Sequence, residues 1–303
     1  MHPALVLDGL TKRYGDRTAV DALTAEIPQG AVTGFIGPNG AGKTTTMAML
    51  LGLVAPTAGD GRVLGEPLRA PARYLHRVGA LLEGPALWPG LTGRQNLRVL
   101  AELGRRDSDR IDEVLALVGL ADRADDRFGR YSLGMKQRLG VAAALLGDPE
   151  LLILDEPTNG LDPAGIREMR RLIAAIAGQS RTVLISSHIL SELEHVCDWL
   201  MVIDGGRLVY TGPVAGFVTH AIRIALAPLR PDDLSALADV VAGRAPHCER
   251  AGDRLVVHGD GAEPRALAAE LVRAALHGGV DLAEIHIERP TLETTYLDRL
   301  DAR

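Results

Sequence analysis

Short apolar runs alternate with stretches of helical periodicity over the first two thirds of the chain. Residues 32–36, 151–154, 182–185 and 200–203 are almost wholly apolar, as expected for parallel strands that are buried on both faces. Residues 88–120 instead place apolar side chains three and four positions apart, which predicts helices. This alternation of strand and helix predicts an α/β fold.

The pattern changes at both ends of this region. Residues 6–10 and 23–27 predict two antiparallel strands joined by a turn. After about residue 217 the predicted order is strand, helix, hairpin, helix, strand, which suits a small two-layer α+β domain. A last amphipathic helix is expected at residues 292–300. The sequence therefore predicts two domains, residues 4–217 and 218–303.

Composition narrows the functional classes. The 303 residues are 47% apolar and 24% charged, and the net charge of -6 argues against a nucleic-acid partner. Two cysteines are too few for a disulfide framework, which favours a reducing compartment. No run approaches the roughly 20 apolar residues that span a bilayer. Any work at a membrane is therefore expected to depend on partner proteins.

The segment after residues 32–36 carries the strongest chemical signal. It matches the pattern G-x-x-x-x-G-K-[S/T] between a predicted strand and a predicted helix, which is the context of a phosphate-binding P-loop. Backbone N–H groups and the helix start then face the phosphates. Lys43 is expected to reach the terminal phosphates and the Thr44 hydroxyl to bind Mg²⁺. The predicted nucleotide-binding residues here are Gly37, Pro38, Asn39, Gly40, Ala41, Gly42, Lys43, Thr44 and Thr45.

Two adjacent carboxylates follow the apolar run at residues 151–154. Because side chains alternate along a strand, Asp155 and Glu156 are expected to point in different directions. Asp155 can then hold the Mg²⁺ shell through water, while Glu156 polarises the attacking water. Acids at a strand end can also be merely solvated, but the P-loop upstream favours the catalytic interpretation.

A serine and a glycine stand ahead of this strand. Ser132 by itself would predict only a helix cap. Its place before the acid pair resembles the ABC ATPase family, whose signature L-S-G-G-Q precedes the same strand. Ser132 and Gly134, which resemble the phosphate-contacting pair of that signature, are kept. The positions that depart from it are Tyr131, Leu133 and Met135.

The resemblance extends over about residues 4–217 and implies further roles. Tyr14 resembles the aromatic residue that stacks on adenine, although a strand-end tyrosine can be purely structural. Asp162 belongs to a loop similar to the one that reaches the partner subunit, and His188 resembles the histidine at the γ-phosphate. Where the family usually has glutamine between its subdomains, this chain has Glu83, which is expected to face Mg²⁺.

The fold implied by the resemblance is a P-loop ABC ATPase. It comprises a RecA-like parallel-sheet core, an antiparallel β subdomain and a helical subdomain at about residues 85–145, followed by the α+β domain. Glu83 and the Ser-Leu-Gly-Met signature resemble the bacitracin- and lantibiotic-resistance branch. Residues 289–293 resemble the tail of these and of daunorubicin-type exporters.

The function implied is ATP hydrolysis, with Mg²⁺, that drives export of a drug or peptide antibiotic. The expected partners are a second ATPase subunit, forming a homodimer, and separately encoded membrane permease subunits. The expected location is cytoplasmic, peripheral on the cytoplasmic face of the membrane, with Leu87 and Trp88 on the docking surface. The alternative is a non-transport ABC ATPase of DNA repair or the ribosome. A kinase or GTPase would have no role for Ser132 or His188.

Overall fold

The computed structural model forms two compact units, Met1–Val214 and Ala215–Arg303. The expected boundary at residues 217 and 218 falls just inside the second unit. The structure describes residues 3–178, 181–187, 189, 196–217, 222–242, 244, 247–259, 264–288, 292, 295 and 296.

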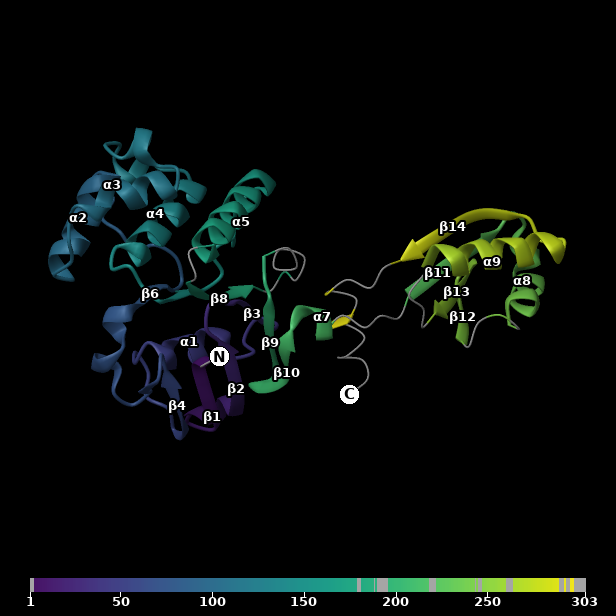
Figure 1. The fold of residues 1–303 in the computed structure, drawn as a ribbon, viewed down its shortest axis with the longest axis horizontal. Helices are drawn as coiled ribbons and strands as arrows, with labels where there is room; N and C mark the ends of the chain where they lie inside the picture. Colours follow the sequence, from purple (N-terminus) through teal and green to yellow (C-terminus); the bar gives the residue numbers. More distant parts are fainter. Residues whose placement is uncertain are drawn as a thin grey trace. The chain divides into compact units, whose positions relative to one another are not determined.

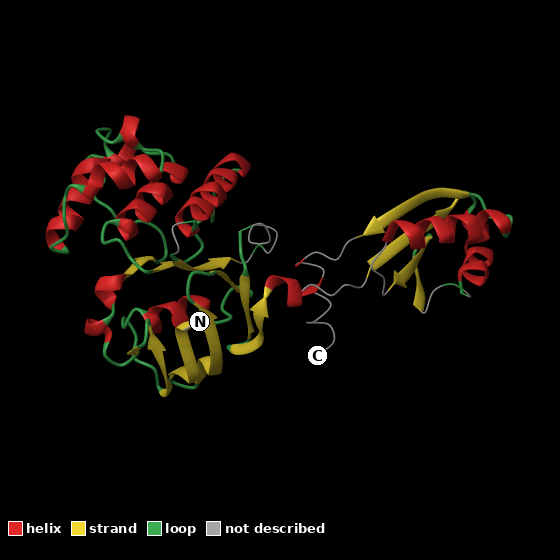
Figure 2. Cartoon of the chain, in the orientation of Figure 1, coloured by secondary structure: helices red, strands yellow, loops and turns green. Residues whose placement is uncertain are grey.

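A mixed sheet forms the framework of the first unit (Figures 1 and 2). Its strands are β3 (Val32–Ile36), β6 (Val78–Leu81), β7 (Leu151–Leu154), β8 (Thr182–Ser187), β9 (Trp199–Asp204) and β10 (Arg207–Pro213). Their order is β10-β9-β3-β8-β7-β6, and every pair is parallel except β9 with the edge strand β10. Every residue of β3, β7 and β8 is buried. This burial on both faces explains their uninterrupted apolar sequences.

A second, antiparallel sheet packs against the same core. It consists of β1 (Pro3–Tyr14), β2 (Arg17–Pro28), β4 (Ala58–Val63) and β5 (Glu66–Pro67), in the order β2-β1-β4-β5. Helix α1 (Lys43–Leu50) follows β3. One apolar cluster joins the three parts, with Leu5 and Leu23 from the antiparallel sheet, Met47 from α1, and Phe35 and Leu151 from the mixed sheet. This shared core holds the start of α1 beside the β1–β2 hairpin.

Four more α-helices are described between β6 and β8. They are α2 (Gly93–Leu103), α3 (Arg110–Leu117), α4 (Leu133–Leu145) and α5 (Pro163–Ala177), and Figure 1 shows α2, α3 and α4 grouped together. A reciprocal cap between Thr92 and Gln95 begins α2, and Ser132 caps α4 by accepting a hydrogen bond from Met135 N. Short 3₁₀ turns lie at Pro71–Arg73, Leu75–Arg77, Ala121–Arg123 and Phe128–Arg130.

Asp148 links this helical group to the sheet. Arg110 of α3 lies 2.9 Å from its carboxylate, and Arg181, directly before β8, donates a hydrogen bond to the same oxygen. Hydrogen bonds from Arg181 and Arg110 lower the pKa of Asp148 from its ordinary value. The cluster therefore fixes the α4–β7 turn to both layers, although its exposure to solvent limits the energy it contributes.

The second unit has helices on one face of an antiparallel sheet. Its elements are β11 (Ile222–Pro228), a 3₁₀ turn (Pro231–Asp233), α8 (Leu234–Val241), β12 (His247–Ala251), β13 (Arg254–Gly259), α9 (Pro264–His277) and β14 (Leu282–Glu288). The strand order is β12-β13-β11-β14, and the short helix α7 (Val214–Phe217) spans the boundary at which the unit begins. Leu226, Leu237 and Leu271 belong to a core of its own. The predicted sequence of strand, helix, hairpin, helix and strand is thus present.

The expected helix at residues 292–300 lies mostly outside the described residues. Of this segment, Leu292, Thr295 and Tyr296 are described, and all three are buried. None of the helices in the described part of the chain is long and apolar enough to span a membrane.

If the two units are independent domains, a cavity in the second should leave the first intact. Leu237→Ala, at a fully buried position on α8, should lower the free energy of unfolding of the second unit by about 2–5 kcal/mol. Amide hydrogen exchange of the full chain should then rise within residues 222–288 and stay unchanged within residues 3–178. Leu276→Ala, at an exposed position on α9, is the matched control. Equal deprotection of both units would show that they unfold as one.

Candidate functional site

The turn between β3 and α1 places the Lys43 side chain against the backbone of residues 37 and 38. Gly42 has φ of 105°, and a Cβ there would lie 2.4 Å from the carbonyl oxygen of Ala19, so only glycine fits. Lys43 Nζ donates hydrogen bonds to the carbonyl oxygens of Gly37, at 2.7 Å, and Pro38, at 3.3 Å. Its side chain is only 5% exposed. The backbone therefore holds the ammonium group where a phosphate can meet it.

A chain of hydrogen bonds joins this turn to the ends of two neighbouring strands. Thr44 Oγ1 donates to Asp155 Oδ2 at 2.7 Å, and Ser186 Oγ donates to Asp155 Oδ1. Ser186 Oγ in turn accepts a hydrogen bond from Glu156 N at 2.8 Å. Glu156 has φ of 45°, and its carboxylate lies 3.5 Å from Lys43 Nζ. The two acids thus point to different partners, Asp155 to Thr44 and Glu156 to the lysine.

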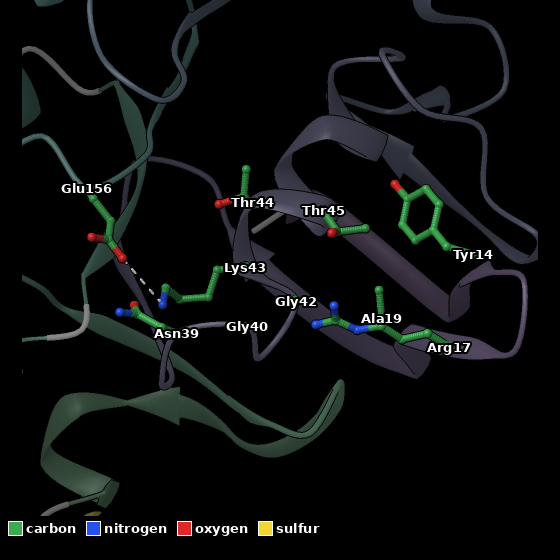
Figure 3. Close-up of a pocket in the computed structure, with 10 residues that line it drawn as sticks. All are labelled: Tyr14, Arg17, Ala19, Asn39, Gly40, Gly42, Lys43, Thr44, Thr45 and Glu156. Carbon is green, nitrogen blue, oxygen red and sulfur yellow. Dashed lines mark ion pairs between the residues drawn. The ribbon is translucent and has the colours of Figure 1, made fainter.

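A cavity of about 320 Å³ lies over the turn. Lys43 and Glu156 border one end and Tyr14 the other, as Figure 3 shows. The Tyr14 ring is half exposed, and Lys12 Nζ lies 5.0 Å from its centroid. The lining residues are Tyr14, Arg17, Ala19, Asn39, Gly40, Gly42, Lys43, Thr44, Thr45 and Glu156. Gly37, Pro38 and Ala41 belong to the turn but do not line this cavity.

A second cavity, of about 340 Å³, shares Thr44 and Glu156 with the first. Its lining residues are Thr44, Glu83, Gly84, Gln137, Asp155, Glu156 and Asn159. Hydroxyl and carboxylate oxygens are hard donors that suit Mg²⁺. Among the described residues no group of three or more His, Cys, Asp or Glu side chains could hold a metal by itself. The donor set therefore fits an ion that also takes ligands from phosphates and water.

The remaining predicted site residues lie elsewhere. Ser132 and Gly134 at the start of α4, and Asp162 at the start of α5, line neither cavity. Asp162 caps its helix by accepting a hydrogen bond from Gly165 N at 2.9 Å. His188 lies outside the described residues, so its predicted role stays a prediction.

Several lining or bridging residues were not predicted from the sequence, and three of them are polar side chains with a clear place in the site. Arg17 opens β2 at the first cavity, Ser186 bridges the two acids, and Gln137 of α4 borders the second cavity. Gln137 is 6% exposed, and within the described part of the chain its Oε1 has no hydrogen-bond partner. A serine on an apolar strand and a glutamine on a helix gave no local signal of these contacts.

Comparison with known proteins agrees with this geometry. Residues 20–159 match the family model for the ABC transporter. Over 203 residues the chain is 51% identical to the bacitracin transport ATP-binding protein BcrA of Bacillus licheniformis, an alignment that covers 66% of each chain. The lantibiotic transport ATP-binding protein SrtF of Streptococcus pyogenes is 42% identical, covering 68% of this chain and 89% of its own.

Other similar proteins bear on the second unit and on the fold. The Nod factor export ATP-binding protein I of Ralstonia nicotianae is 35% identical over 99% of this chain and 94% of its own, so the likeness includes the second unit. The structure of cbiO1 from Clostridium perfringens, part of the ABC transporter complex cbiONQ, superposes with a TM-score of 0.64 at 27% identity. The superposition covers 70% of this chain and 89% of the cbiO1 chain. The predicted α/β P-loop fold is confirmed.

Ser186 offers a test of the bridge between the acids. Ser186→Ala removes the hydroxyl that holds Asp155 and Glu156 N, so kcat for ATP should fall about tenfold while KM changes little. Steady-state kinetics measures both. Thr182→Ala is the matched control, because it removes a partly buried hydrogen bond, accepted from Gly30 N, at the other end of the same strand. A similar loss of kcat in both variants would reduce the role of Ser186 to strand stability.

Proposed function

The chain belongs to the ATP-binding subunits of ABC transporters, and we propose that it drives export of a peptide antibiotic or related drug through separate membrane subunits. It binds and hydrolyses ATP. The observation that carries the proposal is the cluster of Lys43, Thr44, Asp155 and Glu156 at one edge of the parallel sheet. Similarity to the bacitracin and lantibiotic transport proteins supports the substrate class.

The geometry supports a separate role for each of the site residues. Lys43 neutralises the terminal phosphates, and the base of ATP stacks on Tyr14 at the far end of the cavity. Thr44, Asp155 and Glu83 would hold Mg²⁺, which supplies Lewis-acid stabilisation of the phosphate charge. Glu156 orients and deprotonates the attacking water. The γ-phosphate competes with Glu156 for Lys43, so binding of ATP releases this carboxylate toward the water.

Completion of the site calls for a second subunit. Ser132 and Gly134 begin α4 but line neither cavity of their own chain. The start of a helix favours an anion, because its first N–H groups are unpaired and its dipole is positive there. We therefore assign these residues to the ATP held by a partner subunit, in a homodimer closed by the nucleotide.

Trp88 is the proposed contact with the membrane subunit. Its side chain is 45% exposed, and Asn96 fixes the loop by accepting a hydrogen bond from Trp88 N at 2.8 Å and donating one to Trp88 O at 3.1 Å. Leu87, predicted beside it, is half-buried. A rigid aromatic side chain in solvent is a favourable anchor for a protein partner. The subunit would then sit on the cytoplasmic face of the membrane.

The non-transport alternative gains nothing from the structure. Repair enzymes of this family carry a long coiled-coil arm between the P-loop and the signature. The longest helix between α1 and α4 has 11 residues, too short for such an arm.

Glu156→Gln tests the assignment of the general base. The amide keeps the size of the side chain but cannot accept the proton, so hydrolysis should slow by about 10²–10⁴-fold while ATP still binds. ATP should then hold a stable dimer, detectable by gel filtration with light scattering. Glu102→Gln, at an exposed position on α2, is the control for loss of charge. A monomer that remains monomeric with ATP bound would contradict the dimer mechanism.

Glu83 tests the link between the second cavity and transport. Glu83→Gln should hydrolyse ATP within about tenfold of the parent, because the amide oxygen is still a hard ligand. Glu83→Ala, which has no ligand atom, should hydrolyse ATP without matching export. The measurement compares ATPase rate with substrate export for both variants in the assembled transporter. Undiminished export by the alanine variant would remove Glu83 from the coupling path.

A further inference from the structure

Arg17 lines the first cavity but belongs to none of the family's signature segments, so no function has yet been given to it. It is the first residue of β2 and pairs across the hairpin with Tyr14, the last residue of β1. Figure 3 shows its side chain extending from the hairpin toward the turn at Gly40 and Gly42. Its Nη2 lies 3.7 Å from the position that a Cβ would take on Gly40. The guanidinium therefore rests against the backbone that is expected to hold phosphates.

The charge of Arg17 is not compensated by protein groups. Its side chain forms no hydrogen bond or ion pair with any residue in the part of the chain that the structure describes. Arg207 and Arg77, by contrast, pair with Asp21 and Glu150 at 2.7 Å and 2.6 Å. The other cation of the cavity, Lys43, already pairs with Glu156.

The Arg17 side chain is exposed to solvent, and its neighbourhood is electropositive and therefore attracts an anion. The turn directs backbone N–H groups inward, and the start of α1 carries a partial positive charge. An arginine beside them raises the positive potential of the cavity further. An arginine fork binds phosphate oxygens with two parallel hydrogen bonds, a geometry that lysine cannot copy. These features select an anionic group of the ligand rather than its base or sugar.

The order of residues along the cavity identifies which anionic group. Lys43 lies at the end that takes the terminal phosphates, and Tyr14 lies at the end that takes the base. Arg17 lies between the two, where the ligand carries its ribose and its first phosphate. Building on the proposed function, we propose that Arg17 binds the α-phosphate of the nucleotide and so contributes affinity for ATP and ADP alike.

The test compares nucleotide affinity in three variants of the hairpin. Arg17→Gln should weaken binding of ATP and of ADP by the same factor, about tenfold, because both ligands keep the α-phosphate. Arg17→Lys should recover part of the loss, since it keeps the charge but not the fork. Arg13→Gln removes the same charge from an exposed position outside the cavity and should change either affinity by less than about twofold. Isothermal titration calorimetry with the full chain gives each Kd, and steady-state kinetics should show a raised KM with kcat unchanged.

Three outcomes overturn the proposal. Unchanged affinity in Arg17→Gln would remove the contact. A loss for ATP without a loss for ADP would place the contact at the γ-phosphate instead. An equal loss of affinity in Arg13→Gln would show that the effect comes from loss of positive charge in general and not from a contact with Arg17.

Lys43→Ala, measured in parallel, distinguishes a failure of this proposal from a failure of the proposed function on which it rests. If Lys43→Ala binds ATP normally, the nucleotide site itself is wrong; if only the Arg17 variants behave normally, the site stands and the α-phosphate contact falls.

Discussion

The buried carboxylate of Asp155 is the constraint on which the rest of the site depends. Its side chain is only 5% exposed, and a carboxylate taken out of water is costly unless hydrogen bonds replace the lost hydration. Thr44 and Ser186 supply those bonds, one to each oxygen. The requirement fixes the first turn of α1 against β7 and β8. Because Ser186 Oγ also accepts a hydrogen bond from Glu156 N, the same requirement sets the direction in which Glu156, the proposed general base, leaves the strand.

The fold was largely predictable because burial left a strong mark on the sequence. Strands β3, β7 and β8 are covered on both faces, so their sequences are apolar throughout and stand out from the amphipathic helices. The second unit was predictable for a related reason, since α8, α9 and β13 each bury one face. Strand order was not predictable in the same way. The placement of β3 between β8 and β9 joins segments that lie about 150 residues apart, and the periodicity of each segment carries no information about its neighbour.

The same distinction between local sequence and long-range contact applies to the functional site. The phosphate-binding turn is contiguous in sequence, so its glycines, Lys43 and Thr44 could be identified from spacing alone. Ser186 and Gln137 reach the site from elements that come near it only after folding, and their residue types are common on strands and helices. Glu83 is an intermediate case. Its position in the sequence indicated a group that faces the metal. In the structure it lines a cavity together with Thr44 and Asp155. Its role in metal binding is a proposal.

The departure of this chain from the usual signature has a physical counterpart at Gly160. Leu133 occupies the position of the first signature glycine, and its Cδ2 would lie 3.0 Å from a Cβ on Gly160. Gly160 also has φ of 75°, a conformation that favours glycine. A side chain at position 160 would therefore crowd this leucine and strain the backbone. Leu161 Cδ2 would likewise lie 3.8 Å from a Cβ on Gly134. The contact joins the start of α4, which is proposed to bind the partner's nucleotide, to the loop before α5, which resembles the loop that reaches the partner subunit. A side chain in place of the signature glycine thus gives these segments a shared packing surface, which would favour their movement as one body in the proposed dimer.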